Sequence, residues 1–81
     1  MTTILKFFSP NCAPCKTLSE KLVQLGVRTT NVDISEESQS VLLVTYQVKK
    51  VPTLVKLEEG KPIKTMVGYS SFEELEKFLA S

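Results

Sequence analysis

The sequence of 81 residues has no histidine, no tryptophan and only two cysteines. Without histidine, a Cys-His nucleophile, a His-liganded zinc site and a histidine general base are all excluded. The charges nearly cancel, to a net +1 at pH 7, so there is no electrostatic basis for binding nucleic acid or an anionic membrane surface. No apolar run approaches the roughly 20 residues that a membrane-spanning helix needs. These absences direct attention to the two thiols.

The composition is that of one globular domain over residues 1–81. Hydrophobic residues make up 42% of the chain and charged residues 23%, which is ordinary for a soluble protein. A chain of this length buries only about 60% of the surface that it exposes when unfolded, so a thin core is expected. Residues 1–8 lack the basic leader of a signal peptide, and we therefore expect a cytoplasmic protein whose thiols stay reduced.

Hydrophobic periodicity and turn signals predict an α/β fold with the element order β-α-β-α-β-β-α. Strands are expected at residues 3–8, 27–34, 53–58 and 61–67, and helices from Cys12 to a Gly26 cap, from Ser35 to about Tyr46, and from Ser71 to Leu79. The first two strands should be parallel with a right-handed crossover, and a hairpin at Glu59-Gly60 should join the last two. The expected sheet is four-stranded and mixed, with the first and third strands central. Of its three flanking helices, the first and last cover one face and the second alone covers the other.

The two cysteines lie two residues apart in the segment NCAPC, residues 11–15. Cys12 is expected in the first turn of a helix, where unpaired N–H groups and the helix dipole favour a negative charge. Its pKa should therefore fall below the free-cysteine value of about 8.5. Cys15 lies one turn further on, on the apolar stripe of the helix, and should be more buried. Ala13 and Pro14 fix the loop between them, since proline early in a helix loses no hydrogen bond.

Such a pair could staple the fold, bind a metal or act as a redox couple. A staple is weakly supported, because a disulfide that closes so short a loop restrains little chain entropy. One C-x-x-C supplies two of the four ligands of a zinc site, so a metal site would need carboxylates or a second chain, as in a Cys-ligated dimer. A C-x-x-C that opens a helix suits redox chemistry better. A non-catalytic subunit that uses the fold as a scaffold is a further alternative.

Three segments, FFSPNCAPCKTLSEKL, YQVKKVPTLVKLEEGK and VGYSSFEELEKFL, resemble successive segments of thioredoxins. The resemblance runs from Ile4 to Leu79 and covers the minimal core of that family. It implies a minimal thioredoxin fold and a thiol–disulfide oxidoreductase that reduces protein disulfides without a bound cofactor. In such an enzyme the Cys12 thiolate attacks the substrate disulfide, and Cys15 then resolves the mixed disulfide.

The same resemblance predicts a substrate-binding surface downstream of the cysteines. It implies that Val51-Pro52 is a cis peptide facing the cysteine pair, although X-Pro bonds are cis in only about 5–6% of cases. The backbone of Val51 would then be free to pair with an extended substrate segment. Thr53 and Gly68 belong to the same predicted surface.

Three residues depart from the thioredoxin pattern. Asn11 replaces the tryptophan that is common before the first cysteine, and Lys50 makes the rim beside Val51 more basic. Lys6 stands where typical thioredoxins bury an aspartate that helps the resolving cysteine lose its proton. We favour the interpretation that Lys6, and also Lys56, lies on the thinly covered sheet face and reaches solvent. The alternative is that the Lys6 ammonium stabilises a thiolate at the cysteine pair.

The resemblance also suggests partners for a monomeric protein. Reducing equivalents would come from NADPH through a thioredoxin-reductase-like flavoprotein, and ribonucleotide reductase is a candidate acceptor. Glutaredoxins share the minimal core, so re-reduction by glutathione is the alternative. They usually carry an aromatic residue inside C-x-x-C and a Gly-Gly-x-x-Asp-like stretch before the last helix. This chain has CAPC and VGYSS at those places, which favours the flavoprotein.

Overall fold

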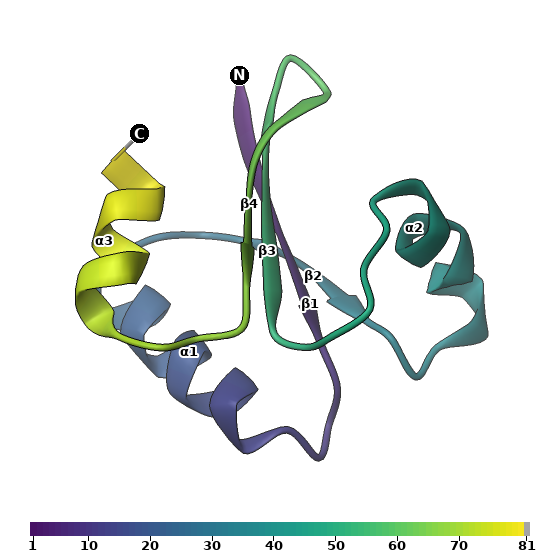
Figure 1. The fold of residues 1–81 in the computed structure, drawn as a ribbon, viewed down its shortest axis with the longest axis horizontal. Helices are drawn as coiled ribbons and strands as arrows, with labels where there is room; N and C mark the ends of the chain where they lie inside the picture. The colour runs from purple at the N-terminus through teal and green to yellow at the C-terminus, as the bar shows by residue number, and fades with distance from the viewer. Residues whose placement is uncertain (81) are drawn as a thin grey trace.

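The computed structural model describes residues 1–80 and shows a four-stranded sheet with helices on both faces (Figure 1). Its elements are β1 (Thr2–Phe8), α1 (Ala13–Gln24), β2 (Thr30–Asp33), the short 3-10 helix η1 (Glu37–Gln39), α2 (Ser40–Thr45), β3 (Thr53–Glu58), β4 (Lys61–Val67) and α3 (Phe72–Ala80). The strand order is β2-β1-β3-β4, with β2 parallel to β1 and the other two pairs antiparallel. The predicted fold class, with the first and third strands central, is confirmed.

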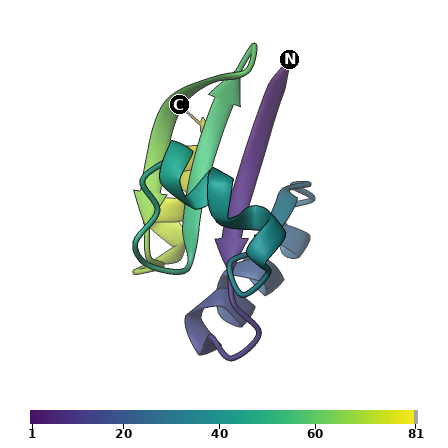
Figure 2. The ribbon, with the colours of Figure 1, turned by 90° about the vertical axis from the view of Figure 1, so that its right-hand side faces the viewer.

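Alternating side chains of the two central strands build one core on each face of the sheet. On one face, α2 packs over a buried cluster formed by Leu5, Phe7, Val32, Val55 and Leu57. On the other face, α1 and α3 enclose Leu18, Leu22, Leu54, Leu75 and Phe78. Figures 1 and 2 show α2 alone on its side of the sheet, as the sequence predicts.

Local turn signals place the ends of α1 and of the hairpin. Gly26 has a φ of +70° just after α1, and the Val27 N–H donates to the Leu22 carbonyl at 3.0 Å, which closes the helix end. Glu59 and Gly60 have φ values of +53° and +80°, the left-handed pair that a tight hairpin turn requires. Both features agree with the prediction.

The second strand is shorter than predicted. It begins at Thr30, whereas the sequence suggests a strand over 27–34. Val27 packs instead against the core under α1 and α3. Its apolar side chain therefore belongs to the loop that returns from α1, and the prediction of a strand from residue 27 is wrong for residues 27–29.

The second helix also begins later than predicted. The N–H and hydroxyl of Ser35 both donate to Asp33 Oδ1, at 2.9 and 2.7 Å, and so form a local turn. The chain then makes the single turn of η1 before α2 begins at Ser40. Ser35 is therefore not the cap of this helix, because Asp33 accepts from both of its hydrogen-bond donors.

No helix within residues 1–80 is long and apolar enough to cross a membrane.

Candidate redox site

Cys12 is the N-terminal cap of α1, directly after the short loop that leaves β1. Its backbone is extended, and its Sγ accepts a hydrogen bond from the Cys15 N–H at 3.2 Å. Ala13 and Pro14 occupy the first positions of the helix, where a proline removes no intrahelical hydrogen bond. The sulfur of Cys12 therefore lies against the positive end of the helix dipole.

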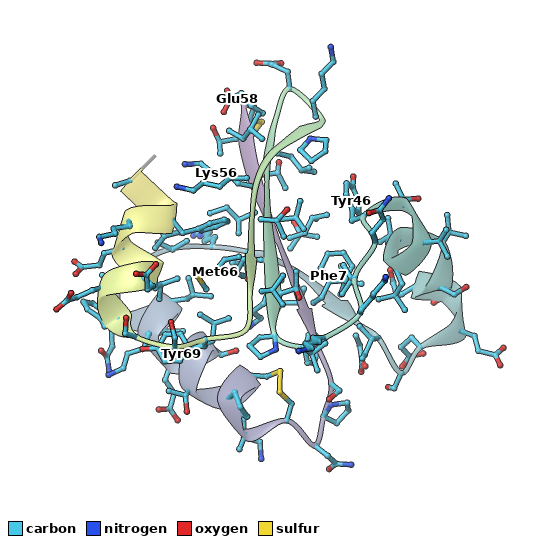
Figure 3. The ribbon with its side chains drawn as sticks, in the orientation of Figure 1. Phe7, Tyr46, Lys56, Glu58, Met66 and Tyr69 are labelled. Atoms are coloured by element: carbon cyan, nitrogen blue, oxygen red, sulfur yellow. A yellow bond between two sulfur atoms is a disulfide. The ribbon has the colours of Figure 1, made fainter. Side chains whose placement is uncertain are left out.

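A disulfide joins Cys12 to Cys15, with their Cα atoms 5.2 Å apart. Figure 3 shows this bond in yellow at the first turn of α1. Cys15 is 3% exposed and Cys12 9%, so Cys12 is the more accessible sulfur-bearing residue of the pair. Asn11, Ala13 and Pro14 are exposed around it. The surface around Cys12 is therefore the more solvent-exposed side of the pair.

The start of β3 lies at the same end of the sheet as the disulfide. Thr53 is opposite Phe7 in the antiparallel pairing of β1 with β3, so β3 begins where β1 ends and leads to Cys12. The Val51–Pro52 peptide bond before β3 is cis. The predicted substrate-binding loop and the cysteine pair are therefore neighbours in space (Figure 1).

Two hydrogen bonds hold the loop around Pro52. The Pro52 carbonyl accepts from the Gly68 N–H at 2.7 Å, which ties the loop to the end of β4. The Thr53 hydroxyl donates to the Lys50 carbonyl at 2.6 Å. Gly68 has a φ of +78°, a conformation that favours glycine. Among residues 1–80, no partner in the chain uses the hydrogen-bonding groups of the Val51 peptide.

Comparison with known proteins identifies this arrangement. The family model described as Thioredoxin matches residues 1–81. The chain belongs to the thioredoxin family. It is 28% identical to a thioredoxin of Bacillus subtilis (strain 168) over 79 residues, a match that covers 90% of this chain and 74% of the relative.

Two further relatives extend this comparison. The SPbeta prophage-derived thioredoxin-like protein YosR of the same Bacillus strain is 30% identical over 77 residues, covering 94% of this chain and 92% of YosR. The oxidised crystal structure of thioredoxin O2 from Arabidopsis thaliana superposes with a TM-score of 0.85 at 26% identity. That match covers 99% of this chain and 73% of the other. With the disulfide between Cys12 and Cys15, these findings make the protein a thiol–disulfide oxidoreductase.

Lys6, which departs from the usual thioredoxin pattern, is buried. The residue as a whole is 8% exposed, and it lies on the sheet face covered by α1 and α3. Its Nζ donates to Ser19 Oγ on α1 at 2.6 Å and lies 5.7 Å from the centre of the Phe8 ring. Burial lowers the pKa of Lys6. The expectation that Lys6 reaches solvent from the thinly covered face is wrong, because α1 packs directly over it.

Lys56 shows the same pattern further along the sheet. It is 9% exposed, and its Nζ donates to the Leu79 carbonyl of α3 at 3.2 Å. Figure 3 shows Lys56 on the side of α3. In the β1–β3 pairing, Lys6 lies opposite Leu54 and Lys56 lies opposite Ile4. Leu54 and Ile4 belong to the core under α1 and α3, so both lysines lie on the sheet face that these helices cover.

A groove of about 460 Å³ connects Lys6 to the cysteine pair. Cys15 and Ser19 line it from α1, and Phe8 and Asn31 line it from the sheet. Sequence interpretation missed Ser19. Its spacing of four residues from Cys15 was the available signal, since residues four apart share one face of a helix.

Metal binding receives no support from the described residues. Within residues 1–80, no three Cys, Asp or Glu side chains gather into a cluster that could hold a metal ion. The two sulfurs are instead bonded to each other. The disulfide and the family membership support thiol–disulfide exchange at this site.

Proposed function

We propose that this protein reduces disulfides in other proteins, with Cys12 as the attacking thiolate and Cys15 as the resolving thiol. In the first step the Cys12 thiolate attacks one sulfur of the substrate disulfide, and the other substrate sulfur leaves as a thiolate. Cys15 then loses its proton and attacks Cys12 Sγ, which releases the substrate and closes the Cys12–Cys15 disulfide. The two electrons pass from the dithiol to the substrate.

The hydrogen bond at Cys12 is the observation that carries this assignment. The Cys12 Sγ caps α1 and accepts the Cys15 N–H at 3.2 Å, an environment that lowers the pKa of a thiol. Cys15 lacks this position and is the more buried of the two. The unequal surroundings favour unequal roles.

The loop before β3 supplies the surface for the substrate chain. The Val51 peptide group is available for pairing with an extended segment, and main-chain hydrogen bonds of that kind bind peptides without regard to their sequence. Pro52, Thr53 and Gly68 hold this loop in place beside the disulfide. Asn11, Ala13 and Pro14 form the exposed rim on the other side of Cys12.

We further propose that an NADPH-dependent flavoprotein of the thioredoxin-reductase kind re-reduces the disulfide. CAPC has no aromatic residue between its cysteines, and VGYSS before α3 is not a glutathione-binding stretch of the Gly-Gly-x-x-Asp kind. The protein would act as a cytoplasmic monomer on protein disulfides, with ribonucleotide reductase as one candidate acceptor. A coupled NADPH assay compares thioredoxin reductase with glutathione plus glutathione reductase. Faster turnover with glutathione would contradict the flavoprotein assignment.

Trapping of the mixed disulfide tests the roles of the two cysteines. The Cys15→Ser variant should accumulate substrate proteins bound through Cys12, because the resolving thiol is gone. The matched Cys12→Ser variant should accumulate none. Diagonal electrophoresis followed by mass spectrometry would identify the captured proteins and the linking cysteine. Capture through Cys15 alone, or no capture by either variant, would refute the assignment.

A further inference from the structure

Lys6 is a largely buried residue whose partly buried Nζ has no acidic partner among the described residues. The ion pairs found within residues 1–80 join the Met1 amino group to Glu58 and Glu59, at the opposite end of β1 from the cysteines. The Lys6 Nζ has instead a neutral hydroxyl, Ser19 Oγ, and the face of the Phe8 ring. Even partial burial of a charge without a counter-charge is unfavourable, although solvent in the groove lessens the cost. The oxidised protein thus holds an ammonium whose charge is not compensated.

Ser19 places this ammonium close to the resolving cysteine. Ser19 follows Cys15 by four residues on α1, so the two side chains share one helix face with their Cβ atoms about 5–6 Å apart. Lys6, Cys15 and Ser19 also line the same groove. The Lys6 Nζ, 2.6 Å from Ser19 Oγ, therefore lies on the same side of α1 as the Cys15 side chain.

We propose that Lys6, held by the positioning residue Ser19, is the counter-charge of the Cys15 thiolate in the reduced protein. This inference rests on the proposed Cys12–Cys15 dithiol cycle. Two-electron reduction breaks the Sγ–Sγ bond, and each sulfur either takes up a proton from solvent or stays a thiolate. The ammonium favours the thiolate at Cys15. In the resolving step that thiolate attacks Cys12 Sγ, and the negative charge departs with the substrate sulfur.

The charge of Lys6 has consequences for the rate and for the redox equilibrium. A lower pKa of Cys15 raises the fraction of thiolate at neutral pH and so speeds the resolving step. The ammonium stabilises the reduced form but has no partner in the oxidised form. The couple is therefore more oxidising than it would be without Lys6.

Other charged groups near the groove act more weakly. Lys16 and Glu20 line it from α1 but are exposed and opposite in sign, so solvent screens both. Lys56 faces the same helices from β3, but it is held at Leu79 of α3. Lys6 is thus the dominant fixed charge on the Cys15 side of the pair.

Thiol titration of the Lys6→Met variant tests the proposal. A Cys12→Ser background isolates Cys15, whose thiolate is followed by ultraviolet absorbance or by the pH dependence of alkylation. An opposite charge nearby shifts a pKa by about one to three units. We expect the lower end, a rise of about one unit in the pKa of Cys15, because the groove is open to solvent.

The reduction potential gives a second measurement with both cysteines present. In Lys6→Met the equilibrium with a thiol redox buffer should shift toward the disulfide by up to about tenfold, equivalent to about 30 mV. Ser19→Ala keeps the Lys6 ammonium but removes the hydrogen bond that positions it. This variant should shift the potential in the same direction by a smaller amount. Lys56→Met is the matched control, because it removes a buried lysine from the same sheet face. It should leave both the Cys15 pKa and the potential unchanged.

A measurement on the unmodified protein covers the case in which a variant fails to fold. Coupling between two sites is reciprocal, so the Lys6 ammonium should titrate at higher pH in the reduced than in the oxidised protein. NMR of the lysine ε-carbon signals follows this directly. Equal titration in both states, an unchanged Cys15 pKa in Lys6→Met, or an equal shift in Lys56→Met would overturn the proposal. None of these measurements uses a substrate, so the proposal can fail while substrate trapping succeeds, or the reverse.

Discussion

Replacing Lys6 by methionine should stabilise the oxidised protein, because it removes a partly buried charge without an acidic partner among the described residues. Replacing buried ion pairs by apolar side chains of similar volume is often neutral or stabilising, by up to about 1–4 kcal/mol. The lost hydrogen bond to Ser19 offsets about 1 kcal/mol of this, and the half-buried Ser19 hydroxyl can still meet water. Because the Lys6 ammonium lines a groove that is open to solvent, its charge is partly screened, and the expected net gain is at most about 1 kcal/mol, which for a domain of this size raises Tm by up to roughly 8 °C.

The pH dependence of this gain follows from the direction of the pKa shift. Burial lowers the pKa of Lys6 in the folded protein, whereas in the unfolded chain it is near 10.4. Between these two values the unfolded state binds more protons, so wild-type stability rises with pH. Lys6→Met lacks this contribution. Its advantage should be largest at neutral pH and should shrink as the pH approaches about 10.4.

Urea unfolding of the disulfide-bonded proteins at pH 7 and at about pH 10 measures both effects. Lys49→Met serves as the control, since Lys49 is exposed and surface substitutions usually change stability by less than about 0.5 kcal/mol. A Lys6→Met protein that is less stable than wild type at pH 7 would refute the argument. So would a gain that is the same at the two pH values.

Three further predictions concern the core, the loop and the rim. Leu54→Ala, at a fully buried position between the sheet and α1, should lower the free energy of unfolding by about 2–5 kcal/mol in urea titrations; a loss below 1 kcal/mol would contradict the packing described. Gly68→Ala should lower the free energy of unfolding by about 1–2 kcal/mol, because the φ of Gly68 is +78°. It should also raise KM for a protein disulfide by loosening the Pro52 loop. An unchanged KM would show that this loop does not bind the substrate. The exposed Lys49 and Lys50 line a groove of about 270 Å³ beside the start of β3. Reversing both charges should lower kcat/KM by about tenfold at low salt for a peptide disulfide flanked by acidic residues. The difference from wild type should fade as the salt concentration is raised.

Local signals in the sequence predicted most of the architecture. Gly26 and the Glu59-Gly60 pair mark turns because their conformations depend on residue type more than on tertiary context. The apolar character of β1 and β3 indicates central strands, because strands buried on both faces of a sheet carry nearly continuous apolar runs. The predicted helix start at Ser35 is wrong, because Asp33 accepts the hydrogen bonds of Ser35. From the sequence alone, either residue could serve as a local cap. Such competition between neighbours is decided only by the folded backbone.

The surroundings of the cysteines were harder to predict than the cysteines themselves. The spacing of Cys12 and Cys15 at a helix start points to redox chemistry by itself. Which helix covers Lys6 depends on the face of β1 from which it projects and on how α1 crosses the sheet. A one-residue change of register reverses the face of every side chain in a strand. For that reason the partnership of Lys6 with Ser19 emerged only from the structure.

The Cys15 N–H donates to Cys12 Sγ, so the atom that exchanges electrons also completes the first turn of a helix. Any change made to this sulfur is therefore a change to the local fold. Alanine at residue 12 would remove the acceptor and cost about 1 kcal/mol in capping, whereas serine is among the best capping residues. An inactive version of this protein for structural work should accordingly carry serine there, so that the loss of chemistry is separated from the fraying of α1.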